Sequence, residues 1–235
     1  MIEVLVNADD FGFSRAVNYG ILNSHKNGIV NSATLMMNAK ATDHAIRIAK
    51  DHRTLKVGIH LVLTWGRPLL RDVPSLVDEE GNFKKQAEIQ GNPEDISLEE
   101  LEREWSAQID KFLALGMIPT HFDSHHHVHA IPAFLPVVKK LSAHYGLPVR
   151  KAGTHFQDIE TVTDTFLSDF YRESAATDYF QKLHERIRDG KSVEVMTHPA
   201  YLDEDLLKHS SYNKDRLKET AILMKATLPE GFVLR

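Results

Sequence analysis

The hydrophobic residues of the chain follow two alternating patterns. Short runs rich in β-branched residues are separated by longer stretches in which apolar residues recur at helical spacing. This alternation predicts repeated strand–helix units rather than separate helical and sheet portions. The strands are predicted at residues 3–7, 32–37, 56–63, 119–123, 147–151, 192–197 and 231–235. The helices are predicted at residues 14–27, 41–51, 98–115, 131–145, 175–189 and 214–226, the first of them capped by Ser14.

Seven strands, nearly all spaced for crossover helices, favour an α/β fold in which a parallel (β/α) barrel is closed or nearly closed. A doubly wound open sheet has the same order of elements and stays open as an alternative. No internal repeat, low-complexity tract or Pro/Gly-rich linker divides the chain. We therefore expect a single domain over residues 1–235.

The longest irregular stretch lies between residues 64 and 97 and contains Trp65, Phe83 and several carboxylates. A connection of this length in a compact domain is usually a functional loop or a disordered one. Flat aromatic rings stack well on the apolar faces of sugars. The stretch is therefore expected to cover the mouth of the barrel, with Trp65 in contact with substrate. A solvent-exposed loop without a function would explain the same sequence equally well.

Composition narrows the class of protein. Hydrophobic residues make up 42% of the chain and charged residues 26%, as in ordinary soluble enzymes. The formal charge of −5 argues against a nucleic-acid partner, which would need a basic surface. No apolar run is long enough to cross a bilayer, and the N-terminus has no secretory pattern, so no membrane partner is expected. The absence of cysteine excludes disulfides and thiolate metal sites and fits a cytoplasmic protein.

Histidine is concentrated in one place. Five of the 14 histidines fall within nine residues: His121, His125, His126, His127 and His129. Histidine is the commonest metal ligand, and in a (β/α) barrel the active site forms at the carboxyl ends of the strands. This cluster follows the fourth predicted strand. The sequence therefore predicts a metal site at that end of the barrel.

The first predicted strand ends in two adjacent carboxylates, Asp9 and Asp10. One of them could cap the following helix, but Ser14 is better placed for the cap. Two neighbouring acids suit a division of labour in which one binds a cation and the other handles a proton. His60 lies late in the third strand, and it shares with Gly58 the face of the strand that is expected to point into the barrel. His60 could therefore be a metal ligand, or it could be a hydrogen-bonded histidine of the core.

One carboxylate and two imidazoles make a facial metal site with open positions, which is typical of catalytic metals. Such a cation polarises a carbonyl group and activates water. Asp123 is expected to hydrogen-bond the distal nitrogen of a ligating histidine. His198, followed by a proline, ends the sixth strand and is a candidate for catalysis or simply a turn residue. Arg150 could bind substrate or a carboxylate, or it could be an exposed surface arginine with no special role.

Four segments together resemble the YdjC-like carbohydrate deacetylases, a family that includes bacterial chitooligosaccharide deacetylases. They are residues 7–12 (NADDFG), 58–61 (GIHL), 120–129 (THFDSHHHVH) and 197–199 (THP). The resemblance extends from the first strand to the sixth, and its first and third segments are highly specific in combination. It implies an irregular barrel related to polysaccharide deacetylases. It also implies that the chain is a hydrolase of carbon–nitrogen bonds other than peptide bonds, which removes acetyl groups from N-acetylated saccharides.

The resemblance further implies a role for individual residues. One divalent cation is held by Asp10, His60 and His125, with Asp9 as general base and His198 as the protonated histidine. Magnesium is the cation usually named for the family, whereas two imidazoles suit zinc better, so the metal stays open. His125 and His129 have the four-residue spacing of the motif from which polysaccharide deacetylases take both histidine ligands, so His127 or His129 could replace His125.

Two other functions are compatible with parts of the sequence. A metal-dependent phosphoesterase or amidohydrolase also uses a His-rich barrel, but usually has a His-x-His pair on its first strand. A non-catalytic sugar-binding protein would not need Asp9 or His198 in addition to a ligand set. The sequence does not identify the sugar or the oligomeric state, and a homodimer is one possible assembly.

Overall fold

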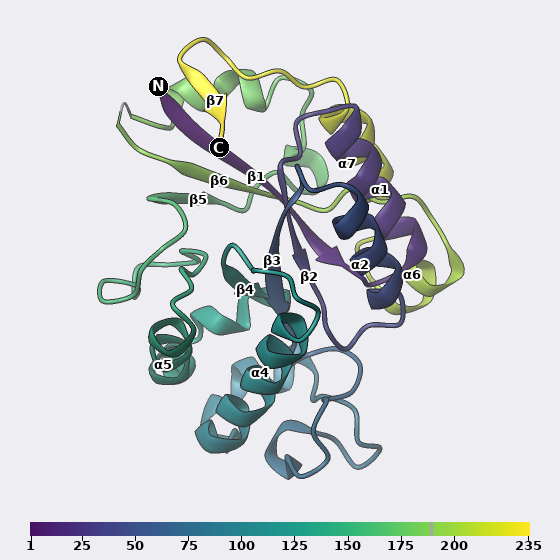
Figure 1. The fold of residues 1–235 in the computed structure, drawn as a ribbon, viewed down its shortest axis with the longest axis vertical. Coiled ribbons are helices and arrows are strands. Elements are labelled where there is room, and N and C mark those ends of the chain that lie inside the picture. The colour runs from purple at the N-terminus through teal and green to yellow at the C-terminus, as the bar shows by residue number, and fades with distance from the viewer. Residues whose placement is uncertain (189) are drawn as a thin grey trace. The chain divides into compact units, whose positions relative to one another are not determined.

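The computed structural model describes residues 1–188 and 190–235 as two compact units (Figure 1). The first unit comprises Met1–Leu35, Lys40–Val57 and Thr163–Arg235, and the second comprises Met36–Ala39 and Gly58–Val162. The chain passes between the units more than once, because each is assembled from separate segments. The expectation of a single domain over residues 1–235 stays a prediction.

The first unit is built on a parallel sheet. Its strands lie in the order β2-β1-β6-β5, and β7 also pairs with β1. Their bounds are β1 (Ile2–Phe11), β2 (Ser32–Leu35), β5 (Thr165–Leu167), β6 (Val193–Thr197) and β7 (Phe232–Leu234). β1 is flanked by strands on both sides, which explains why it is buried almost throughout. Ala8 of β1 is level with Thr197 of β6, so the residues that follow these two strands emerge next to each other.

The described residues of the first unit form the α-helices α1 (Arg15–Lys26), α2 (Thr42–Asp51), α6 (Glu204–His209) and α7 (Asp215–Leu223). The predicted cap of α1 is confirmed, because the Ser14 side chain accepts a hydrogen bond from the backbone N–H of Val17. Gly20 of α1 lies against the backbone after β6, where an added Cβ would collide with the Cα of Ala200. Only glycine allows α1 to approach that loop so closely.

The second unit contains a parallel pair, β3 (Lys56–Leu61, which begins in the first unit) and β4 (Phe122–Ser124). His60 is level with Asp123 in this pair. The helices of this unit are α3 (Gln86–Gly91), α4 (Leu98–Leu113) and α5 (Leu135–Tyr145). The described residues form seven strands with only parallel pairings between them, so the predicted α/β class and strand count are confirmed.

Two predicted elements are wrong. Residues 147–151 do not form a strand: Val149 makes only isolated parallel bridges, to Phe122 and Thr161, and Pro148 has no N–H with which to extend a ladder. The fifth strand is β5 instead. Residues 175–189 were predicted as a helix, but the structure has a short 3₁₀ helix at Phe180–Glu185, and residue 189 lies outside the described residues.

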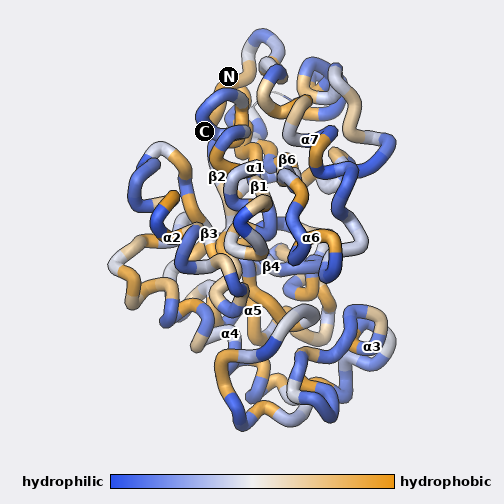
Figure 2. The backbone as a smooth tube through the Cα atoms, turned by 90° about the vertical axis from the view of Figure 1, so that its right-hand side faces the viewer, coloured by the Kyte–Doolittle hydropathy of each residue, from blue (hydrophilic) through white to orange (hydrophobic). Residues whose placement is uncertain are grey.

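The stretch at residues 64–97 is less irregular than predicted. It contains α3 and two 3₁₀ turns, Pro74–Leu76 and Pro93–Asp95, and is largely hydrophilic around α3 (Figure 2). The buried carboxylate of Glu104 on α4 accepts hydrogen bonds from the backbone N–H groups of Leu69 and Leu70, which fixes the start of the stretch. Phe83 is 1% exposed, so its ring is part of the core and is not available to stack on a sugar. Trp65 is only partly buried.

Among the described helices, none combines the length and apolar character needed to span a membrane.

Candidate active site

The end of β1 is bent, and the bend redirects two carboxylates. The register between β1 and β2 shifts between Ala8 and Phe11, as at a β-bulge. Asp10 has a φ of 65°, a left-handed conformation that few non-glycine residues adopt. Such bulges commonly re-aim side chains beside active sites. Asp9 and Asp10 are nearly fully buried, and the side-chain amide of Asn7 donates to Asp9 Oδ1 at 2.9 Å.

Asp10 is paired with a buried cation from α7. Arg216 Nη2 donates to Asp10 Oδ2 at 2.7 Å, and Arg216 Nε donates to the backbone carbonyl of Tyr212 at 2.7 Å. The arginine is 3% exposed. Removing either partner of a buried pair leaves an uncompensated charge, so this pair fixes α7 against the end of β1.

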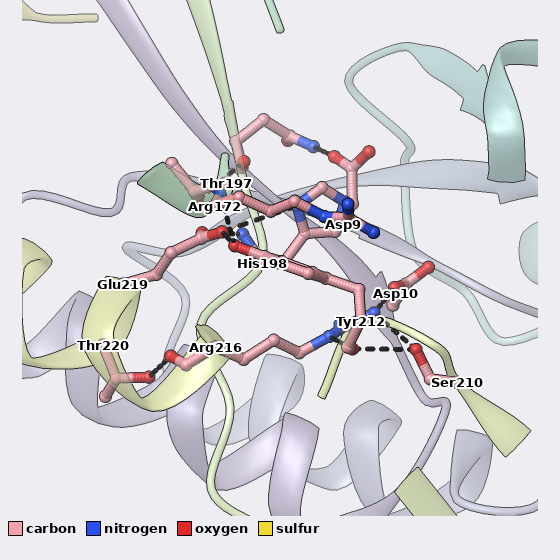
Figure 3. Close-up of polar contacts among 11 residues, drawn as sticks. Asp9, Asp10, Arg172, Thr197, His198, Ser210, Tyr212, Arg216, Glu219 and Thr220 are labelled. Atoms are coloured by element: carbon pink, nitrogen blue, oxygen red, sulfur yellow. Dashed lines mark hydrogen bonds and ion pairs between the residues drawn. The ribbon is translucent and has the colours of Figure 1, made fainter. Parts of the chain in front are cut away.

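His198 follows β6, the strand next to β1, and lies against a second buried group of α7. Its backbone N–H donates to Glu219 Oε2 at 2.5 Å, and its Nδ1 is 3.9 Å from Glu219 Oε1. Tyr212 donates its hydroxyl to Glu219 Oε1 at 2.5 Å (Figure 3). The rings of Tyr171 and Tyr212 have centroids 5.8 and 5.6 Å from that of His198.

Glu219 is fully buried, and burial raises the pKa of its carboxyl to about 8. Hydrogen bonds from Tyr212 and from the His198 backbone, together with the Arg216 charge, act in the opposite direction, and the Asp9 charge raises the pKa further. A buried carboxyl whose pKa lies near neutrality, beside a histidine, is typical of functional sites.

In the second unit, His60 is oriented by a carboxylate. His60 Nδ1 lies 2.7 Å from Asp123 Oδ1, and Arg150 Nη2 lies 2.8 Å from Asp123 Oδ2. All three side chains are buried, and Arg150 is 0% exposed. Although burial alone would raise the pKa of Asp123, the Arg150 charge and the hydrogen bond from His60 hold it far below its usual range. An ionised Asp123 accepts a proton-bearing Nδ1, which leaves Nε2 of His60 as the nitrogen with a lone pair for a ligand.

This arrangement confirms the expected bond between Asp123 and a candidate ligand. It also bears on Arg150, since a fully buried guanidinium that pairs with Asp123 is suited to holding that carboxylate in place. Its assignment to substrate binding stays a prediction.

The histidine cluster follows directly on β4, which ends at Ser124. Residues His125–Ala130 form two short 3₁₀ turns separated by a kink, at which His126 and His127 have φ values of 57° and 54°. His125 stands edge-on to His60, with ring centroids 5.6 Å apart. Two imidazoles that are distant in sequence thus lie together within this unit.

Two other histidines of the cluster have structural partners. His129 Nδ1 lies 2.6 Å from Ser124 Oγ and its Nε2 lies 3.1 Å from the carbonyl of Arg150. Burial, with the charge of His127 as a second cause, lowers the pKa of His129 to about 3, so its ring is neutral. His121 packs against Gly58, where an added Cβ would lie 2.8 Å from two of its ring atoms. These contacts favour His125 over His129 as the second imidazole ligand.

The structure therefore places the predicted residues in two groups. The first unit brings Asp9, Asp10 and His198 to the ends of neighbouring strands, and the second brings His60 beside His125. Arg216 and Glu219 of α7 were missed from sequence. Their signal was present, because they interrupt the buried face of the helix that they share with Thr220 and Leu223.

A family model described as YdjC-like protein matches residues 3–232. The chain belongs to this family. A carbohydrate deacetylase of Geobacillus stearothermophilus is 50% identical over 95% of this chain and 90% of its own length. A carbohydrate deacetylase of Brevibacillus brevis is 47% identical, over 97% of this chain and 94% of its own.

Two solved structures are similar to this chain over nearly its whole length. A protein of Enterococcus faecalis, provisionally described as a cellobiose-phosphate cleavage protein, has a TM-score of 0.88 and 36% identity, covering 95% of this chain and 90% of that one. A lactam utilization protein from Thermus thermophilus has a TM-score of 0.57 at 16% identity, covering 100% of this chain and 99% of that one. The second likeness is one of fold alone.

Proposed function

We propose that this YdjC-like protein is a carbohydrate deacetylase that hydrolyses the acetamido group of an N-acetylated sugar. Relatives of 50% and 47% identity that carry this name support the reaction. The observation that carries it is the pairing of β1 with β6, which sets two buried carboxylates beside a histidine. Amide hydrolysis needs a group that accepts a proton from water and another that gives one to the departing nitrogen.

We further propose that Asp10, His60 and His125 hold one divalent cation. These three side chains suit a divalent cation. A carboxylate and two imidazoles can bind magnesium, zinc and other divalent metals, although with different affinities. Asp123 supports the assignment by orienting His60 so that Nε2 is the available nitrogen. When bound, the cation would polarise the acetyl carbonyl and lower the pKa of water.

The protein's own groups perform the proton transfers. Asp9 accepts the proton of the attacking water, and the amide of Asn7 holds its carboxylate in place. His198 donates a proton to the sugar nitrogen as the carbon–nitrogen bond breaks, which yields acetate and a free amino sugar. Arg150 keeps Asp123 ionised and so acts on His60 indirectly.

Acetate release from N-acetylated mono- and oligosaccharides tests the reaction. We expect acetate to form, to stop after chelation and to return when a divalent metal is added. Hydrolysis of p-nitrophenyl phosphate without acetate release would instead identify a phosphoesterase. Saccharide binding without turnover in the metal-loaded protein would identify a sugar-binding protein.

Trp65 is proposed to stack on the sugar, since its ring is only partly buried at the start of the 64–97 stretch. Trp65→Ala is expected to raise KM for an oligosaccharide about tenfold with little change in kcat, because a stacking contact stabilises ground state and transition state alike. Trp65→Phe, which keeps a ring, should recover most of the affinity. An unchanged KM in Trp65→Ala would remove Trp65 from the substrate site.

A further inference from the structure

The end of β6 is held by a chain of buried and partly buried hydrogen bonds that the proposed proton transfers do not use. The backbone N–H of Arg172 donates to the Tyr212 hydroxyl at 3.1 Å, and this hydroxyl donates to Glu219. Glu219 in turn accepts the backbone N–H of His198 (Figure 3). One carboxyl group thus joins the segment before α7 to the residue that follows β6.

This arrangement is costly unless the carboxyl has a task. Glu219 is 0% exposed, and a buried carboxyl destabilises the fold unless its partners compensate for lost hydration. A neutral side chain would anchor the backbone N–H of His198 equally well. What only a carboxyl adds is a group that can ionise, and its Oε1 lies 3.9 Å from His198 Nδ1.

We propose that Glu219 is the positioning residue of His198: it fixes the imidazole with Nδ1 toward α7, so that Nε2 faces the substrate. The carboxyl anchors the backbone of His198 through one oxygen and faces its ring with the other. Tyr212 and Tyr171 flank the ring and limit its rotation, because their own rings stack with centroids 4.0 Å apart. This role rests on the proposed function of His198 as proton donor.

The charged and titratable groups around Glu219 determine whether it raises or lowers the pH at which His198 loses its proton. Its neighbours are His198, which follows β6, Tyr212 and Arg216 from the chain around α7, and Asp9 from β1. Because the pKa of Glu219 is raised to about 8, its carboxyl ionises towards alkaline pH, where the charge stabilises a protonated imidazole next to it and so opposes loss of the His198 proton. Replacing Glu219 by a neutral residue should therefore make His198 lose its proton at lower pH.

Glu219→Gln tests the proposal in the metal-loaded protein. We expect kcat to fall about 10- to 100-fold with KM changed by less than about twofold, because the group positioned acts in the transition state. The alkaline limb of the kcat/KM profile should move to lower pH by about one unit. An NMR titration of His198, assigned by its loss in His198→Ala, should show the same displacement.

Thr220→Val is the matched control, since Thr220 is the next residue of α7 and is also buried, with its hydroxyl bonded to the carbonyls of Ala200 and Arg216. It should leave both the pH profile and the His198 titration unchanged. An equal loss in Thr220→Val, or a His198 titration that does not move in Glu219→Gln, overturns the positioning role. A displaced titration with unchanged kcat supports the positioning role and instead contradicts the proton-donor function of His198.

Discussion

Asp9→Asn should lower kcat for acetate release by about 10²- to 10⁴-fold while the protein keeps its divalent metal. The amide is nearly the same size as the carboxylate, and its oxygen can still accept the hydrogen bond that Asn7 donates to Oδ1. What the change removes is the capacity to accept a proton from water. Steady-state kinetics and metal analysis of the same sample measure the two effects.

Asp10→Asn is the comparison variant for Asp9→Asn. It should lose metal as well as turnover, because Asp10 is proposed as the ligand. If Asp9→Asn loses metal in the same proportion as Asp10→Asn, then Asp9 belongs to the ligand set and another group is the base.

His198→Ala should separate substrates by their leaving group. For an N-acetylated sugar we expect a loss in kcat of about 10²-fold or more, because the amine cannot depart without a proton. For an acetyl ester with a phenolate leaving group the loss should be less than about tenfold, since phenolate departs as an anion. Both rates are measured with the same enzyme preparation.

His209→Ala, which changes an exposed histidine at the end of α6, serves as control and should leave both rates unaltered. A His198→Ala variant that slows the ester as severely as the amide would assign His198 to binding of substrate or stabilisation of the oxyanion.

The parts of the fold that local sequence determines were predictable. β1, β6 and α1 have continuous apolar runs, a helical period and a Ser cap, so their existence follows from the chain itself. Residues 147–151, which were wrongly predicted as a strand, include the apolar residues Leu147 and Val149 at the alternate spacing of a true strand. The failure of this prediction depends on Pro148 and on which strand lies alongside, and the second of these is not local information.

The candidate site shows the same division. Motif residues at strand ends were found because strand order predicts where they emerge. The α7 residues Arg216 and Glu219 were not, because their partners Asp10 and His198 are distant in sequence. The burial of Phe83 was hidden for a similar reason, since its environment is created by the way the 64–97 stretch packs on itself: its N–H bonds the carbonyl of Gly66, and it bridges to Val77.

Two glycines, one within α1 and one just after it, allow close contact with two segments that hold the candidate site: the loop after β6 and the end of α7. Gly20 lies against Ala200, two residues after His198, and an added Cβ at Gly28 would collide with the carbonyl oxygen of Leu223, the last residue of α7. A methyl group at either position has backbone, not a flexible side chain, in its way, so the loop or the helix must be displaced. In a random-mutagenesis screen for inactive variants, these two positions should therefore recur with the ionisable residues, although neither has a functional group of its own. The same reasoning predicts that, among related sequences, residues on the exposed surface of α1 vary more than these two glycines.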